Sequence, residues 1–359
     1  MHAHGSAPRL TTAQVSFEIN VITPFSGVTL EIGGAVETYW KAIASPVATP
    51  ATKLTTTRFA PPPRSFASAQ TSPSMQSLST AGSHSLTHSS LSGNFLYVTV
   101  QVTRDLQPVL FAEWQLPTDG FNVGVSDVTL AQFLALAERR GRHTLPLSST
   151  SSLAAKDVQG AVSQAMVALS DLLKVIPASV GVCVELAHAT GAMLEQRALG
   201  RGVELNAAVD AVLRTIYDVT TQGAGQSRAR RNVVFTSFSP DACAALNWKQ
   251  PNYPVFFASQ CGRTGVHAPS ATALGTRDAR DFRVASLHAA VEVCKTNNLL
   301  GLLLDAESLH EVPSLVQAVK DCGLLLGAFG TASHLSVLES HGIDAFLHDG
   351  IMTYSTRHY

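Results

Sequence analysis

The feature that most constrains the fold is an alternation of short apolar runs with segments of helical periodicity, which begins at Phe95. These runs lack the alternating polar residues of a sheet with one solvent-exposed face, so they predict strands that are covered on both faces. Such alternation predicts a parallel sheet, and this many units in this length favours a closed barrel. An open doubly wound sheet would need a glycine-rich phosphate turn after its first strand, and none is present. Beyond the first strand, the runs are 181–186, 232–238, 254–259, 299–305, 324–330 and 344–349.

Composition supports a large globular domain. Hydrophobic residues make up 45% and charged residues 14% of the 359 residues, which supplies a substantial core. Lys plus Arg number 25 against 26 Asp plus Glu, so no net field directs the chain to nucleic acid or to an anionic membrane. No apolar run is long enough to cross a bilayer. We therefore expect no nucleic-acid partner and no membrane insertion, and a location in the cytoplasm, the nucleus or both.

Three regions differ in their residue pattern. Residues 14–45 alternate apolar and polar residues and predict a small β element, whereas 46–92 are rich in Ser, Thr, Ala and Pro and predict a flexible, disordered linker. Residues 93–359 form the predicted barrel. The basic stretch SRARR, which ends at Arg231, is interpreted as a solvated loop because no aromatic residue interleaves with it.

The first barrel strand and the turn after it read FLYVTVQVTRDLQPVLF, and the strand carries an unusual polar pair. Its valines alternate with Thr99 and Gln101, so these two side chains share one face of the strand. A hydroxyl or an amide oxygen can join a coordination shell. Without full negative charge, however, neither side chain would hold Mg²⁺ or Ca²⁺ well.

These residues resemble the glycerophosphodiester phosphodiesterase (GP-PDE) family. The resemblance is carried by VQVTRDLQPVLF, VCVEL, VVFTSFSPDACAALNWKQPNYPVFF and GIDAFLHDGIMTYS. The segments VITPF, LEIGGAVETYWK and LPTDGFNVGVSDVTLAQF are most similar to the C-terminal phosphodiesterase-like domain of a fungal phosphate-system cyclin-dependent kinase inhibitor. The resemblance implies an α/β fold of the TIM-type (β/α)8 class, with a cyclin and cyclin-dependent kinase complex as the partner system.

The resemblance also assigns positions in the site. In such enzymes carboxylates hold a divalent cation while a histidine pair transfers protons. Thr99 and Gln101 stand where the family has two metal-binding carboxylates. Ala112 and Glu113 stand where it has a catalytic His-Asp pair, and alanine cannot transfer a proton. Only Glu185 matches a usual metal ligand, and it is expected to be at most a weak residual one.

The family's first strand, which carries a His-Arg-Gly motif, has no counterpart in this sequence. The first strand is therefore predicted to be degenerate. Residues 90–93 or the β element at 14–45 would supply a substitute, or the barrel wall is open there.

Active sites of such barrels form at the carboxyl ends of the strands. Ser237, Asp305 and His348 fall at such ends and, with Glu185, are the candidate ligand-pocket residues. Ser237 is expected to shape the pocket rather than to act as a nucleophile. For Glu185, hydrogen bonds to neighbouring side chains are favoured over metal binding.

Two classes of function follow from these residues. The favoured one is a catalytically degenerate phosphodiesterase-like domain that acts as a regulatory or interaction module in fungal phosphate-starvation signalling, without a cofactor. The alternative is an active enzyme that hydrolyses glycerophosphocholine-type diesters with Mg²⁺ or Ca²⁺. A third hypothesis is a pocket that binds a phosphate-bearing small molecule without cleaving it.

Overall fold

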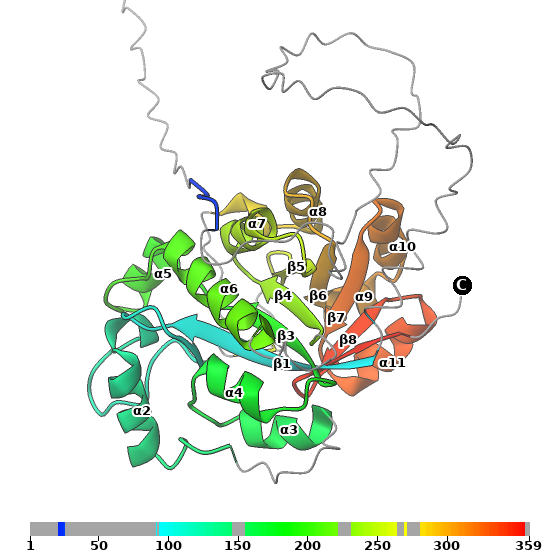
Figure 1. Ribbon diagram of the computed structural model, residues 1–359. Helices are drawn as coiled ribbons and strands as arrows, with labels where there is room; N and C mark the ends of the chain where they lie inside the picture. Colours follow the sequence, from blue (N-terminus) through cyan, green and yellow to red (C-terminus); the bar gives the residue numbers. More distant parts are fainter. Residues whose placement is uncertain are drawn as a thin grey trace, which may run out of the picture.

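The structure is a computed structural model, and it describes residues 21–25, 91, 93–145, 155–221, 231–263, 269–270 and 281–355. Within these residues one nine-stranded sheet has the order β2-β1-β3-β4-β5-β6-β7-β8-β9, and a pairing between β1 and β9 closes it (Figure 1). The fold is the predicted TIM-type barrel. Its strands are β1 Gly93–Val102, β2 Pro108–Leu110, β3 Gly181–Leu186, β4 Val233–Ser237, β5 Val255–Ser259, β6 Gly301–Asp305, β7 Leu325–Phe329, β8 Ala345–His348 and β9 Ile351–Tyr354.

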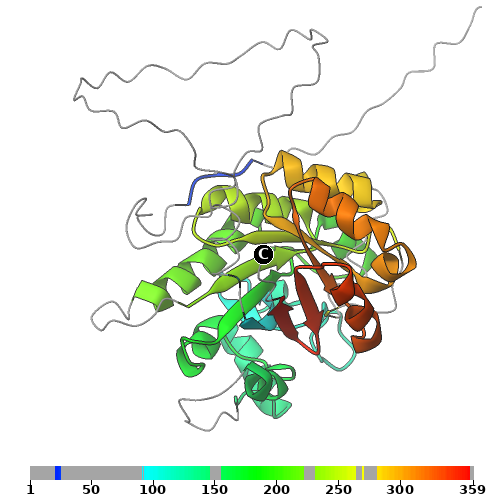
Figure 2. The same cartoon turned by 90° about the vertical axis from the view of Figure 1, so that its right-hand side faces the viewer.

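Helices cover the outside of the sheet (Figure 2). Several begin where the sequence places a capping side chain: the hydroxyls of Thr129, Thr190, Ser239 and Ser286 each accept a hydrogen bond from a backbone amide of the helix that follows. The helices are α2 Leu130–Arg139, α3 Ala155–Val162, α4 Leu169–Val175, α5 Gly191–Gln196, α6 Leu205–Thr221, α7 Pro240–Lys249, α8 Leu287–Thr296, α9 Ala306–Glu311, α10 Ser314–Asp321 and α11 Ala332–Ser340, with 3-10 turns η1 Val125–Asp127 and η2 Phe282–Val284.

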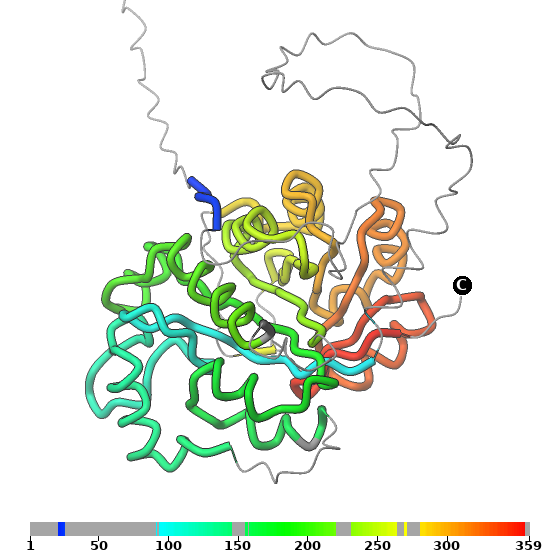
Figure 3. Tube along the Cα trace, viewed as in Figure 1, coloured from blue at the N-terminus to red at the C-terminus, as the bar shows by residue number. Residues whose placement is uncertain are grey.

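The strand that closes the barrel comes from the C-terminal end of the described chain. β9 pairs antiparallel with both β8 and β1, whereas the strands from β1 through β3 to β8 pair in parallel around the wall. Along the edge of β1 opposite β3, β9 pairs with Gly93–Leu96 and β2 pairs with Val100–Val102. Figure 3 shows cyan β1 beside red β9. Among the described residues, two short antiparallel pieces thus fill the edge where the family's first strand is expected, so the wall is closed by a segment that the sequence did not predict for this role.

The two faces of the sheet bury different side chains. On β1 the outward side chains of Leu96, Val98 and Val100 join the apolar layer under the helices. The inward face begins with Phe95, whose ring meets that of Tyr354 edge to face at 5.3 Å between centroids. Apolar and aromatic side chains therefore fill the amino-terminal end of the barrel, and the polar inward residues lie at the other end.

The prediction of a solvated loop at Arg231 is wrong, because this side chain is buried. One of its terminal nitrogens donates to the carbonyls of Pro177 and Val180, both at 2.8 Å. The other donates to Ile176 at 2.8 Å and Leu173 at 3.2 Å. The guanidinium thus satisfies carbonyls at the carboxyl end of α4, where a cation is favoured. The other arginines of the cluster lie outside the described residues.

The two N-terminal regions are largely beyond the described residues. Of the predicted linker at 46–92 only Leu91 is described. Of the predicted β element at 14–45 only Val21–Phe25 is described, and it carries no strand assignment. Both assignments therefore stay predictions.

Candidate functional site

The candidate residues lie at the carboxyl ends of the barrel strands, as predicted for a site of this architecture. Thr99 on β1 is in register with Glu185 on β3, and Glu185 with Thr236 on β4. Because parallel neighbours in register present their side chains to the same face, all three point into the barrel. Ser237, Asp305 and His348 end β4, β6 and β8.

Glu185 is the centre of this polar end, and its carboxylate accepts hydrogen bonds from three hydroxyls. Tyr97 Oη and Thr99 Oγ1 both donate to Glu185 Oε2 at 2.7 Å. Ser270, from the segment between β5 and α8, donates to Oε1 at 3.1 Å. The residue as a whole is only 1% exposed. A buried carboxylate is thus stabilised by the fold's own donors, which agrees with the hydrogen-bonded role favoured from sequence.

The buried charge affects the groups beside it. Burial, and then the negative charge of Glu185, raise the pKa of Tyr97 well above its usual value. The same two causes raise the pKa of the Cys183 thiol. Tyr97 and Cys183 therefore remain protonated at neutral pH, and the cysteine is not an activated nucleophile.

Gln101 uses its amide to hold the segment that follows β2. Its Nε2 donates to the carbonyl oxygens of Phe111 at 3.0 Å and Glu113 at 2.6 Å. Ala112 lies between these two residues and is half-buried, and the Glu113 side chain is exposed. At this position the chain has a positioning contact where the family resemblance implies a metal ligand.

The other candidates have local partners. Ser237 Oγ donates to the carbonyl of Leu186 at 2.6 Å. Asp305 caps α9 by accepting from the amide of Glu307 at 3.2 Å. His348 Nδ1 lies 3.1 Å from the carbonyl of Gly330, and its other ring nitrogen lies 3.2 Å from an oxygen of Asp349. These contacts position the strand ends; whether these residues touch a ligand stays a prediction.

Among the described residues, the donor set around Glu185 does not fit a site for Mg²⁺ or Ca²⁺. Hard divalent cations need several oxygen ligands with enough negative charge, and here one carboxylate faces neutral hydroxyls that donate to it. Over the described residues, no group of three or more His, Cys, Asp or Glu side chains is arranged to hold a metal ion.

Two contributors to this end of the barrel were not predicted. Ser270 reaches Glu185 from 85 positions along the chain, and no local pattern signals that contact. His188 follows β3 and lines two small cavities, one beside Gln101 and one beside Asp241. Burial lowers the pKa of His188, although the carboxylates of Asp241 and Glu204 oppose this effect. Its place just after the VEL segment was the signal that could have identified it.

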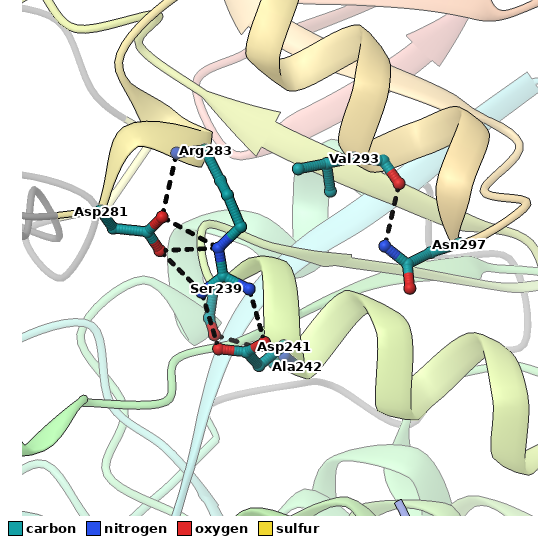
Figure 4. A network of polar contacts seen from close by, with 7 residues as sticks. All are labelled: Ser239, Asp241, Ala242, Asp281, Arg283, Val293 and Asn297. Carbon is teal, nitrogen blue, oxygen red and sulfur yellow. Dashed lines mark hydrogen bonds and ion pairs between the residues drawn. The ribbon is translucent and has the colours of Figure 1, made fainter. Parts of the chain in front are cut away.

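An ionic network fixes the rim of the second cavity (Figure 4). Arg283 donates from two terminal nitrogens to both oxygens of Asp241, at 2.7 and 2.9 Å. It also donates to Asp281 at 2.8 to 3.1 Å. Burial would raise the pKa of Asp281, but hydrogen bonds from Arg283 outweigh it and hold this pKa below its ordinary value. The network ties the start of α7 to η2.

The fold and the site define a TIM-type (β/α)8 barrel whose polar side chains gather at the carboxyl ends of its strands. The chain belongs to the glycerophosphoryl diester phosphodiesterase family, whose family model matches residues 96–354. The match begins within β1 and ends with β9, so it covers the wall apart from the first three residues of β1.

Its curated relatives include regulators and enzymes. Ankyrin repeat protein nuc-2 of Neurospora crassa is 33% identical over 89% of this chain and 30% of its own length. Glycerophosphocholine phosphodiesterase GDE1 of Eremothecium gossypii is 25% identical over 94% and 28%. Phosphate system positive regulatory protein PHO81 of Saccharomyces cerevisiae is 26% identical over 67% and 21%. The chain therefore spans less than a third of the length of these relatives. In the described part of the chain, no helix is long and apolar enough to span a bilayer.

Proposed function

We propose that this barrel is a catalytically degenerate member of its family that acts as a regulatory or interaction module in fungal phosphate-starvation signalling. The observation that carries the proposal is the state of Glu185, whose carboxylate accepts from Tyr97, Thr99 and Ser270. A carboxylate that already accepts hydrogen bonds from three hydroxyls is a poor cation ligand.

The proposed loss of activity follows from two missing parts of the chemistry. Without a bound cation the charge that develops on the phosphoryl oxygens has no Lewis acid to stabilise it. With Ala112 at the family's histidine position, the leaving oxygen lacks a proton donor there. Electrostatic stabilisation of this kind is worth about 3 kcal/mol or more of barrier per removed donor, so the two losses together support a non-catalytic barrel.

The regulatory part of the proposal rests on the relatives. One is named a phosphate system positive regulatory protein, and another with higher identity is an ankyrin repeat protein. By resemblance, the partner would be a cyclin and cyclin-dependent kinase complex. Purified chain immobilised on a sensor should bind such a fungal complex saturably, and absence of binding at micromolar concentrations would remove this partner.

The test of the site is a turnover assay with glycerophosphocholine and either Mg²⁺ or Ca²⁺. We expect no release of glycerol phosphate above the rate of the Glu185→Gln variant, which keeps the shape of the side chain but removes its charge. Turnover by the unmodified chain that disappears in Glu185→Gln would establish the active-enzyme alternative, for which the GDE1 relative is the supporting observation.

Calorimetry with glycerol phosphate tests the third hypothesis, binding without cleavage. Saturable heat that is lost in His188→Ala would assign the ligand to the cavities beside that residue. Zero heat would eliminate glycerol phosphate as the ligand.

A further inference from the structure

A short N-terminal segment, Val21–Phe25, lies against the outer helical layer, beside α7 (Figure 1). Its sequence is VITPF, and its contacts are with residues about 180 to 230 positions away. Ile22 and Phe25 are partly buried against the apolar core under the helices. The contact therefore joins two distant parts of the chain on the outer helical layer of the barrel.

Asn206, in the first turn of α6, forms hydrogen bonds with the backbone of this segment. Its Nδ2 donates to the carbonyl of Val21 at 2.8 Å, and its Oδ1 accepts from the amide of Thr23 at 2.9 Å. One side-chain amide thus pairs with a carbonyl and with the amide two residues later, as a neighbouring strand would. Glu204 accepts a further hydrogen bond from Asn206 Nδ2 at 2.8 Å, which holds the Asn206 side chain in place.

A buried cation provides the second contact. The side chain of Lys249, at the end of α7, is 0% exposed. Its ammonium donates to the carbonyl of Thr23 at 2.7 Å and to Asp210 at 2.8 Å. A buried ammonium needs acceptors, and the segment supplies one of them. The next residue, Pro24, has no backbone N–H, so it leaves no donor without a partner.

An aromatic slot provides the third contact. The ring of Phe25 stacks on Tyr217 of α6, with 6.0 Å between centroids and 28° between planes. Tyr217 is fixed from behind, because its hydroxyl accepts from Asn252 at 2.9 Å and its ring packs on Tyr253 at 5.7 Å. This contact favours an aromatic side chain at the position of Phe25, four residues after Val21, whose carbonyl makes the first backbone contact.

We propose that Asn206, Lys249 and Tyr217 form a peptide-binding site on the outer face of the barrel that recognises an extended Ile-Thr-Pro-Phe segment. In this chain the occupant is Val21–Phe25, which anchors the N-terminal part of the chain to α6 and α7. The site recognises backbone through Asn206 and Lys249, and takes its sequence preference from the partial burial of Ile22 and the stacking of Phe25 on Tyr217. The proposed peptide-binding site does not depend on whether the polar end of the barrel around Glu185 is catalytic.

The first test uses the full chain and hydrogen exchange at the amide of Thr23. We expect this amide to exchange at least ~10-fold more slowly than a free peptide amide, and Asn206→Ala to remove the protection. Asn247→Ala is the matched control, because that side chain donates instead to the carbonyls of Asn297 and Asn298. An unprotected Thr23 amide in the unmodified chain would overturn the proposal.

The second test adds a labelled peptide, NVITPFS, and follows its fluorescence anisotropy. The tethered segment competes at a high effective concentration, so the peptide should bind the Phe25→Ala full chain at least ~10-fold more tightly than the unmodified chain. Asn206→Ala in the Phe25→Ala chain should abolish this binding. Equal affinity for the unmodified and Phe25→Ala chains, or binding that Asn206→Ala leaves unchanged, would contradict a specific site.

Discussion

The mouth of the barrel, which is the polar end around Glu185, and the outer face over α6 and α7 both contain buried polar groups. The partners of these groups come from different parts of the chain. At the mouth, Glu185 accepts from hydroxyls of the barrel strands and of the segment before α8. On the outer face, Asn206 and Lys249 bind the backbone of a segment far away in the sequence. The carboxylate at the mouth is thus satisfied by the barrel itself, whereas the groups on the outer face pair with a separate segment, which is the basis of the proposed peptide-binding site.

The largest expected effect is that of a second carboxylate at the mouth. Thr99→Glu would place a buried carboxylate in register with Glu185, and an uncompensated buried charge should lower the free energy of unfolding by about 3 to 5 kcal/mol. Urea unfolding measures the change. Thr353→Glu, at an exposed position on β9, is the control and should change it by less than about 0.5 kcal/mol.

Addition of Ca²⁺ provides a second measurement on the Thr99→Glu variant. If Thr99→Glu with Glu185 recreates part of a cation site, Ca²⁺ should recover stability in this variant and leave the unmodified chain unchanged. A stability loss close to that of the Thr353→Glu control would show that the mouth is more open to water than the burial of Thr99 and Glu185 implies.

Removal of one hydroxyl should have a smaller effect. Thr99→Val keeps the shape of the side chain but removes one donor to Glu185, which should cost about 1 to 3 kcal/mol in urea unfolding. Thr353→Val is the matched exposed control and should lie within about 0.5 kcal/mol of the unmodified chain. Equal effects of the two valines would refute the role assigned to the Thr99 hydroxyl.

On the outer face, Phe25→Ala should cost about 1 to 2 kcal/mol, because it removes a partly buried ring and its stacking on Tyr217. Phe282 is 78% exposed, so Phe282→Ala is the control and should be nearly neutral. If both alanine variants unfold at the same urea concentration as the unmodified chain, the segment does not contribute to the folded state.

The smallest expected effect is a pH dependence at His188. Burial lowers its pKa in the folded state, so the unfolded chain binds more protons and stability falls as the pH drops below the ordinary value of about 6.5. His188→Gln should flatten this slope by at most about 1.4 kcal/mol per pH unit. His341→Gln, at an exposed position, should leave the slope unchanged. An unchanged slope in His188→Gln would contradict burial of this ring.

The sequence predicts the wall of the barrel well, because continuous apolar runs identify strands buried on both faces. All six runs beyond the first strand coincide with strands, and Thr99 shares the inward face of β1 as alternation requires. The closing strand β9 was missed, since IMTY is short and its partner is at the other end of the domain. Tertiary pairing of this kind leaves no local pattern.

The site was harder to predict for the same reason. The position and polarity of Glu185 follow from its strand, but its donor Ser270 comes from a loop whose path no periodicity gives. Arg231 was wrongly placed in solvent because composition shows its basic neighbours and not the carbonyls that receive it. The sequence shows VITPF only as a family resemblance, because the residues that contact it come together only when α6 and α7 pack side by side.

The most direct test of the central claim is calorimetric titration of the purified chain with Mg²⁺ and with Ca²⁺, in parallel with Glu185→Gln. We expect the same small heats of dilution for both proteins with both ions, because the Glu185 carboxylate accepts hydrogen bonds from hydroxyls. A saturable, one-to-one heat in the unmodified chain that disappears in Glu185→Gln would contradict it.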